Sequence, residues 1–176
     1  MIAHRQINRK RGLIILVTNP SFSMLVKSPS LLLAFGFGSG LSPKAPGTFG
    51  SLAGLAIWFL IADLSLPTYL IVVAISGLCG VFICGTAAKK MGVHDHGGIV
   101  WDEFVGLWIA MTALPVSWTS VLLGFGLFRF FDIIKPWPIS WIDKKVSGGW
   151  GIMLDDVAAG AAASLTIYMF VSLGWV

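Results

Sequence analysis

This 176-residue chain has few charged residues and only two cysteines. Both features limit the kinds of protein to which it can belong. Charged residues make up 11% of it, under half of the roughly 25% found in soluble globular domains. A mean hydropathy of +0.87 and a hydrophobic fraction of 56% indicate a protein of the lipid bilayer. The two cysteines, Cys79 and Cys84, lie inside an apolar run. No disulfide framework is expected from them, and we predict that both are buried as small apolar side chains.

The N-terminal segment lacks the features of a secretory signal. A basic run between residues 5 and 11 is followed by only five apolar residues before Thr18. A signal peptide requires a longer apolar region and a small-residue cleavage site. We therefore expect residues 1–30 to be a basic, irregular tail that can include a short helix, drawn to anionic lipid on the cytoplasmic surface. Residues 31–176 are expected to form a single membrane-embedded domain.

Apolar runs predict an all-α fold, a polytopic membrane helical bundle. Residues 68–88 carry no charge and are long enough to span a bilayer, as is the apolar part of 152–173. The runs at 49–62, 104–114 and 119–131 fall short of the ~20 residues that a span requires. We expect 104–114 and 119–131 to form a hairpin of half-length helices or two tilted helices inside the bundle, whereas the sequence leaves open whether 49–62 spans the membrane fully.

A loop is expected over residues 39–51, because prolines and glycines are concentrated there. Thr48 or Ser51 is predicted to cap the helix that follows. Lys44 would supply a positive charge near the N-terminus of that helix, where the backbone amides of Gly47, Thr48 and the residues after them can hold an anion. The alternative is an ordinary interfacial loop.

The basic residues are unevenly distributed. The turns at 63–67 and 114–118 contain no Lys or Arg, so the positive-inside rule places both turns outside the cell. All twelve Lys and Arg fall in 1–44, 89–90 and 129–145, which are then cytoplasmic. Of the eight acidic residues, only Asp63 lies outside. The reactive groups therefore share one face, whereas a channel or transporter more often has ionisable residues near mid-membrane.

Five acidic residues are candidate ligands of a metal ion. Asp102 and Glu103 open a helix, where one carboxylate suffices to stabilise the helix dipole. Asp155 and Asp156 lie among apolar residues, where isolated buried carboxylates are costly. Asp132 has two possible roles. It takes part in a local set of salt bridges, or it is a metal ligand or catalytic carboxylate. Clustered carboxylates favour Mg²⁺, and we expect all five to hold one or two such ions.

Basic and histidine side chains complete the candidate site. Arg129 and Lys135 lie three residues on either side of Asp132 and either pair with it or hold a phosphate. His94 and His96 are candidate general acids or bases, the alternative being a turn held by the aspartate between them. Zinc is disfavoured, because no cysteine or second histidine pair completes a usual ligand set.

Three common phosphoryl-transfer signatures are absent from the sequence. There is no Cys-x5-Arg phosphatase loop and no Asp-x-Asp phosphotransferase motif. The Lys/Arg-Pro, Ser-Gly-His and Arg/His series of histidine-type lipid phosphatases is also missing. A phosphatase built on this chain would need a different, carboxylate-based site.

Four long, polar segments in a fixed order resemble the phosphatidylglycerophosphatase A family. They are GFGSGLSPKAPGTFGSLAG (36–54), MGVHDHGGIVWDEFVG (91–106), FRFFDIIKPWPISWID (128–143) and GGWGIMLDDVAAG (148–160). The resemblance implies an integral inner-membrane, Mg²⁺-dependent phosphatase of phospholipid biosynthesis. It would convert phosphatidylglycerophosphate into phosphatidylglycerol and phosphate. It also implies a helical fold in which a central helix is surrounded by others.

The resulting hypothesis is a phosphoric monoester hydrolase with its site on the cytoplasmic face of a bacterial inner membrane. Its predicted catalytic residues are His94, His96, Asp102, Glu103, Asp132 and Asp156, its metal ligands Asp102, Glu103, Asp132, Asp155 and Asp156, and its phosphate-binding residues Lys44, Thr48, Arg129 and Lys135. Water or an aspartate is the nucleophile. A divalent-cation carrier using the same carboxylates, or a structural scaffold, is the alternative. The membrane and its anionic lipid are the expected partners, nucleic acid is not, and homo-oligomerisation is left open.

Overall fold

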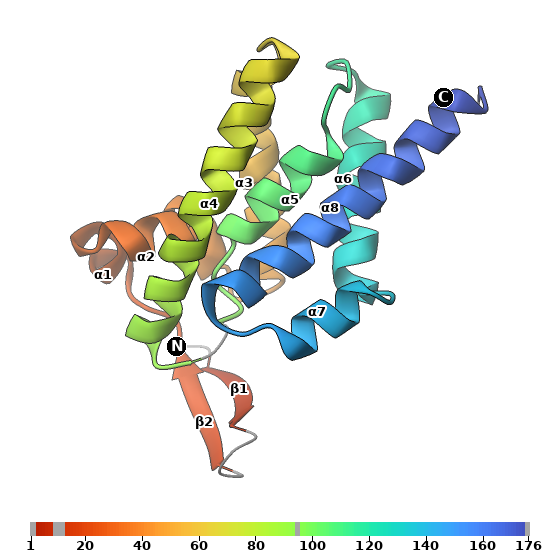
Figure 1. Cartoon of the computed structure of the whole chain (residues 1–176). Coiled ribbons are helices and arrows are strands. Elements are labelled where there is room, and N and C mark those ends of the chain that lie inside the picture. Colours follow the sequence, from red (N-terminus) through yellow and green to blue (C-terminus); the bar gives the residue numbers. More distant parts are fainter. Residues whose placement is uncertain (1–2, 9–12, 94–95, 175–176) are drawn as a thin grey trace.

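The computed structural model describes residues 3–8, 13–93 and 96–174, with side chains described from residue 19 on (Figure 1). Two short strands precede a set of helices. In chain order the elements are β1 (Ala3–Asn8), β2 (Leu13–Thr18), α1 (Phe22–Lys27), α2 (Pro29–Ala34), the 3-10 helix η1 (Gly36–Leu41), α3 (Pro46–Ile61), α4 (Leu66–Met91), α5 (Trp101–Ala110), α6 (Trp118–Ile134), α7 (Ile139–Lys145) and α8 (Gly148–Ser172).

Two helices of the bundle are long and apolar enough to cross a membrane. They are α4, with 26 residues, and α8, with 25. Both predicted spans, 68–88 and 152–173, lie almost entirely within them. The short helix α5 lies between α3, α4, α6 and α8 and packs against all four (Figure 1). The predicted helical fold is thus confirmed for the chain from Phe22 onward, and two of its helices have the length and composition of membrane spans.

Helix α5 has only ten residues, too few to span a bilayer. It is apolar on nearly every side, which is the pattern of a fully buried helix. Phe104, Val105, Leu107 and Trp108 are all buried. The Trp108 indole Nε1 donates a hydrogen bond of 2.8 Å to the carbonyl oxygen of Gly54 in α3. This short helix therefore forms the centre of the core, and its N-terminal turn is held in a fixed place.

Glycines allow α8 to approach α5 closely. A Cβ on Gly160 would lie 2.2 Å from the carbonyl oxygen of Gly106, and a Cβ on Gly106 would lie 2.7 Å from that of Asp156. Any side chain larger than hydrogen would push the helices apart, and small residues serve this role in membrane helix packing generally. The contact lies about one helical turn beyond the acidic residues of both helices, so it brings those residues together.

The prediction of an irregular N-terminal tail was wrong. Strands β1 and β2 pair antiparallel, from Ala3 opposite Thr18 to Asn8 opposite Leu13. The sequence of β2, LIILVT, is rich in β-branched residues and favours a strand. Helices α1 and α2 follow, and α2 begins with Pro29, whose fixed φ suits the first position of a helix.

The loop expected over 39–51 was also only partly right. Helix η1 occupies part of it, and α3 already begins at Pro46. The residue before α3 is Ala45, in a left-handed conformation with no side-chain cap. Ser51 instead lies inside α3 and donates a hydrogen bond of 2.8 Å to the carbonyl oxygen of Gly47. The prediction that Thr48 or Ser51 caps this helix was therefore wrong, because α3 begins at Pro46 and both residues lie inside it.

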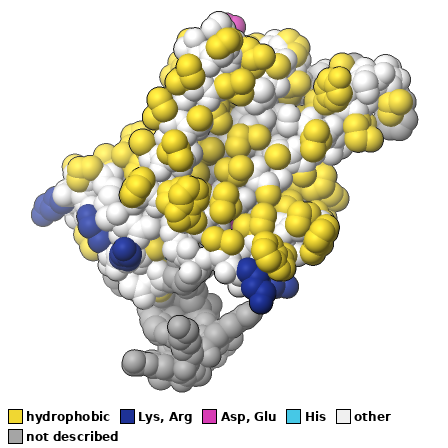
Figure 2. Space-filling model, viewed as in Figure 1, with side chains coloured by type: hydrophobic (Ala, Val, Ile, Leu, Met, Phe, Trp, Pro, Cys, Tyr) yellow, Lys and Arg dark blue, Asp and Glu magenta, His cyan; other side chains and the backbone are white. Residues whose placement is uncertain are grey.

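The surface between α4 and α8 is mainly hydrophobic (Figure 2). On the face shown, the Lys and Arg side chains gather toward the end where the β-hairpin lies. Cys79 is on the exposed side of α4, whereas Cys84 is buried, so the prediction that both are buried was wrong for Cys79. A small apolar side chain on an outward face is expected where the neighbour is lipid.

Candidate active site

Three carboxylates from two helices converge in the core. Asp102 and Glu103 belong to the first turn of α5, and Asp156 lies two turns into α8. Each contributes an oxygen, and these oxygens lie within 4.8 Å of one another. Within the described part of the chain, Oδ1 of Asp102, Oε2 of Glu103 and Oδ2 of Asp156 have no hydrogen-bond partner. Buried oxygens in this arrangement fit a hard divalent cation, which takes oxygen ligands.

Burial makes this cluster electrostatically unfavourable without a cation. Loss of hydration raises the pKa of the Asp102 carboxyl well above its usual range, and the nearby charges of Glu103 and Asp156 raise it further. Burial also raises the pKa of Glu103 to about 7. A bound cation would offset this penalty by stabilising the ionised forms.

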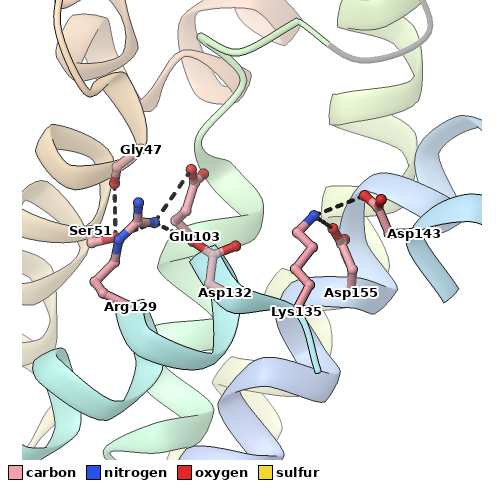
Figure 3. Close-up of polar contacts among 8 residues, drawn as sticks. All are labelled: Gly47, Ser51, Glu103, Arg129, Asp132, Lys135, Asp143 and Asp155. Atoms are coloured by element: carbon pink, nitrogen blue, oxygen red, sulfur yellow. Dashed lines mark hydrogen bonds and ion pairs between the residues drawn. The ribbon is translucent and has the colours of Figure 1, made fainter. Parts of the chain in front are cut away.

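Arg129 on α6 ties the cluster to α3 (Figure 3). Its Nη1 donates a hydrogen bond to the Asp132 carboxylate and lies 4.0 Å from Oε1 of Glu103. The same nitrogen lies 3.4 Å from the hydroxyl oxygen of Ser51, to which it donates. Asp132 is also close enough to interact electrostatically with Glu103 and Asp156. Arg129 is thus held beside the carboxylates from two sides, and its Nε has no partner in the described structure.

The first turn of α3 lies directly against this ion pair. A Cβ on Gly47 would be 2.5 Å from Oε1 of Glu103 and 3.2 Å from both terminal nitrogens of Arg129. Only glycine leaves room for the charged groups. The sequence predictions placed Gly47 in a possible anion-binding helix start and Ser51 as a possible cap, but they did not bring either residue to Glu103 or Arg129. The small residues of GTFGS, directly after the lysine and two prolines, were the signal that the helix start approaches another group.

Lys135 forms a second ion-pair group next to the first (Figure 3). Its Nζ donates hydrogen bonds to the carboxylates of Asp155 and, at 2.8 Å, Asp143. Burial alone would lower the pKa of Lys135, but the two carboxylates outweigh that effect and raise it. Asp155 therefore faces Lys135 and is not one of the three clustered carboxylates, although it adjoins Asp156 in the chain.

Four predicted site residues remain, and three of them are described. Lys44 is exposed, and Thr48 is half-buried in the first turn of α3. His96 is buried, with its ring centroid 5.3 Å from that of Phe35. Its Nδ1 accepts a hydrogen bond of 3.0 Å from the Gly98 amide. When the imidazole is neutral, its proton is therefore on Nε2. His94 lies outside the described residues.

Comparison with known proteins agrees with the sequence resemblance. The family model described as Phosphatidylglycerophosphatase A matches residues 32–171. A protein named phosphatidylglycerophosphatase A from Escherichia coli (strain K12) is 50% identical over 151 residues, covering 85% of this chain and 87% of its own. The protein of that name from Haemophilus influenzae is 48% identical over 152 residues, covering 85% and 93%.

A third relative has a different name. A Bacteroides thetaiotaomicron protein, named provisionally as a phosphatidylinositol-3-phosphatase, is 36% identical over 153 residues and covers 81% of this chain and 95% of its own. No solved structure matches the chain. The family match spans most of the chain and includes all three clustered carboxylates. The chain is a phosphatase that belongs to the phosphatidylglycerophosphatase A family.

Proposed function

We propose that this protein hydrolyses the terminal phosphomonoester of phosphatidylglycerophosphate, giving phosphatidylglycerol and phosphate, with Mg²⁺ held by Asp102, Glu103 and Asp156. The observation that carries the metal assignment is the convergence of three carboxylates, each with one buried oxygen that has no hydrogen-bond partner among the described residues. An all-oxygen ligand set favours Mg²⁺ over softer metals. When bound, such an ion polarises a phosphoryl oxygen and lowers the pKa of a water molecule.

The protein's own cations bind the phosphate in this proposal. Arg129 carries a planar fork of donors and is held beside Glu103 by Ser51 and Asp132. Lys135 adds a positive charge close to Asp155. Both cations are already oriented by carboxylates, so binding of a phosphate requires little rearrangement of side chains. Lys44 and Thr48, near the start of α3, extend the proposed phosphate site.

The reaction breaks the bond between phosphorus and the glycerol oxygen and forms a bond from phosphorus to the attacking oxygen. Direct attack by water requires that the glycerol oxygen gain a proton as it leaves. We assign that proton to His94, which precedes α5 in the sequence and lies outside the described residues. The described contacts of His96 with Phe35 and Gly98 instead suit a residue that shapes the segment before α5.

The proposed location is the bacterial inner membrane, with several crossings and the site facing the cytoplasm. The clustered carboxylates, Arg129 and Lys135 lie at one end of the bundle, as do the lysines at the end of α4 and in α7. The positive-inside rule places that end in the cytoplasm. Asp63, in the turn between α3 and α4, is then on the outer side. A cation carrier would need acids reachable from both sides, which this placement does not provide.

Phosphate release from phosphatidylglycerophosphate in detergent micelles tests the proposal. Wild-type protein, Asp156→Asn and the matched control Asp63→Asn are compared with Mg²⁺ and with a chelator. We expect release by wild type and Asp63→Asn only when Mg²⁺ is present, and a loss of at least ~100-fold in Asp156→Asn. Release in the chelator, or full activity in Asp156→Asn, would contradict the metal mechanism. Phosphatidylinositol 3-phosphate, assayed in parallel, decides which headgroup is preferred.

A further inference from the structure

Two adjoining cavities form a crevice along one side of the contact between α4 and α8. The first has a volume of about 570 Å³ and opens near the C-terminal end of α4, beside Thr86, Lys89 and Ser147. The second, about 340 Å³, lies further along the same helices. Both are lined by Val81 and Trp150, so one crevice runs from the basic end of the bundle into its hydrophobic part.

The inner cavity is lined only by apolar residues and glycine. Its walls include Val73 and Gly77 of α4 and Val157 of α8, and its floor includes Val105 and Ile109 of α5. A surface of this kind is stable when it is covered by hydrocarbon. Gly77 is accessible from the crevice, since a Cβ there would only reach ordinary contact, 3.6 Å, with Val105.

The outer cavity adds a positive charge. Lys90 is engaged, because its Nζ donates hydrogen bonds of 2.7 Å and 2.9 Å to the hydroxyls of Ser28 and Ser30. Lys89 is exposed on the cavity wall and makes no ion pair with any described residue. Trp150 lies between the two cavities, 53% exposed, as expected for a ring at a membrane interface. The crevice thus combines a cation at the membrane surface with a long apolar floor.

Two sulfur-containing side chains separate this crevice from the clustered carboxylates. Met153 lines the inner cavity, and its Sδ lies 3.9 Å from Sγ of Cys84. Both residues are buried, and Cys84 lies within electrostatic range of Asp102. A molecule in the crevice would therefore lie behind the site without contacting its carboxylates.

We propose that the crevice between α4 and α8 binds one anionic phospholipid, with its headgroup at Lys89 and an acyl chain along Gly77 and Val157. The charge of the outer cavity selects an anionic headgroup, and the inner cavity accepts hydrocarbon. The bound lipid packs along the surfaces of both helices and so supports the position of α8, the helix that carries Asp156. This is a second lipid site, independent of the proposed reaction.

Photolabelling tests the proposal with the full chain in detergent micelles. The probes are phosphatidylserine and phosphatidylcholine, each with a diazirine in one acyl chain, and peptide mass spectrometry locates the adducts. Neither probe carries a phosphomonoester, and labelling needs no turnover, so the result does not depend on the proposed hydrolysis. We expect phosphatidylserine to label the crevice walls on α4 and α8 more strongly than phosphatidylcholine.

Two pairs of variants make the test specific. Gly77→Phe fills the inner cavity and should abolish crevice labelling, whereas Ala161→Phe, on the exposed side of α8, should not. Lys89→Gln should reduce labelling by phosphatidylserine about fivefold and leave phosphatidylcholine unchanged, while Lys144→Gln at the same end of the molecule changes neither. Ala74→Phe, in the same wall, replaces Gly77→Phe if that variant fails to fold. Equal labelling by both probes in wild type, or labelling that persists when the cavity is filled, would overturn the proposal.

Discussion

Gly160 in α8 meets Gly106 in α5 so closely that a Cβ on Gly160 would lie 2.2 Å from the Gly106 carbonyl oxygen. Because Asp156 precedes Gly160 by one helical turn, this backbone contact sets how near Asp156 comes to Asp102 and Glu103. The separation of the three carboxylates therefore depends on two residues without side chains.

Gly160→Ala should accordingly separate α5 from α8. Overpacking of this kind costs about 1–3 kcal/mol of unfolding free energy, and a shift of about 1 Å at a catalytic group can cost ~100-fold in rate. Thermal unfolding in detergent and phosphate release measure the two effects. Gly126→Ala is the matched control, because a Cβ on Gly126 has no neighbour within 4 Å. Wild-type activity in Gly160→Ala would show that the contact does not position the site.

Ser51→Ala should weaken catalysis through Arg129. The Ser51 hydroxyl accepts a hydrogen bond from Nη1 of Arg129 and donates one to the Gly47 carbonyl oxygen. Loss of the first bond, about 1 kcal/mol, should lower kcat/KM roughly fivefold. Thr166→Val is the control, since Thr166 donates the same kind of bond to Ala162 in α8, far along the helix from the cluster. Equal effects of the two variants on kcat/KM would assign Ser51 a purely structural role.

Without a cation, the protein should become more stable as the pH falls from 8 towards 5. The pKa of Glu103 is about 7 in the folded state, against an ordinary value of 4.5. Between these values the folded state holds the proton more tightly than the unfolded state, so unfolding free energy rises as pH falls. Thermal unfolding in a chelator measures this trend.

Cation binding should show the opposite dependence on pH. Binding to Glu103 requires its ionised form, so the Mg²⁺ concentration for half-maximal stabilisation should rise roughly tenfold per pH unit below 7 if one proton is displaced. Glu103→Gln removes the titrating group and should flatten the change around pH 7. A half-maximal Mg²⁺ concentration that is constant from pH 5 to 8 would contradict a role of Glu103 as a ligand.

The sequence predicted the helices better than the contacts between them. The charge-free run at 68–88 and the acidic pair at 102–103 each marked an element whose position follows from local residue types. The start of α3 at Pro46 and the β-hairpin were missed, because proline and glycine counts do not separate a loop from a proline-initiated helix. Short strands near a basic run likewise give a weak signal.

The sequence did not show which group each charged side chain of the site faces. Asp155 and Asp156 are adjacent, and the sequence predicted both as ligands. On a helix, however, neighbouring side chains point about 100° apart. Asp156 therefore faces α5, while Asp155 reaches Lys135, whose own position depends on its left-handed conformation at the end of α6. Such a division depends on how α6, α7 and α8 pack together, which is a tertiary property.

Asp155→Asn and Asp156→Asn should consequently differ in their response to Mg²⁺. Asp156 belongs to the clustered carboxylates, so its loss should raise the half-maximal Mg²⁺ concentration at least ~10-fold. Asp155 pairs with Lys135, so its loss should mainly lower stability, by about 1.5–3 kcal/mol for a hydrogen bond between charged groups. Mg²⁺ titrations of phosphate release, together with thermal unfolding, separate the two effects. An equal rise in the Mg²⁺ requirement of both variants would make Asp155 a ligand after all, with Lys135 displaced from it when the cation binds.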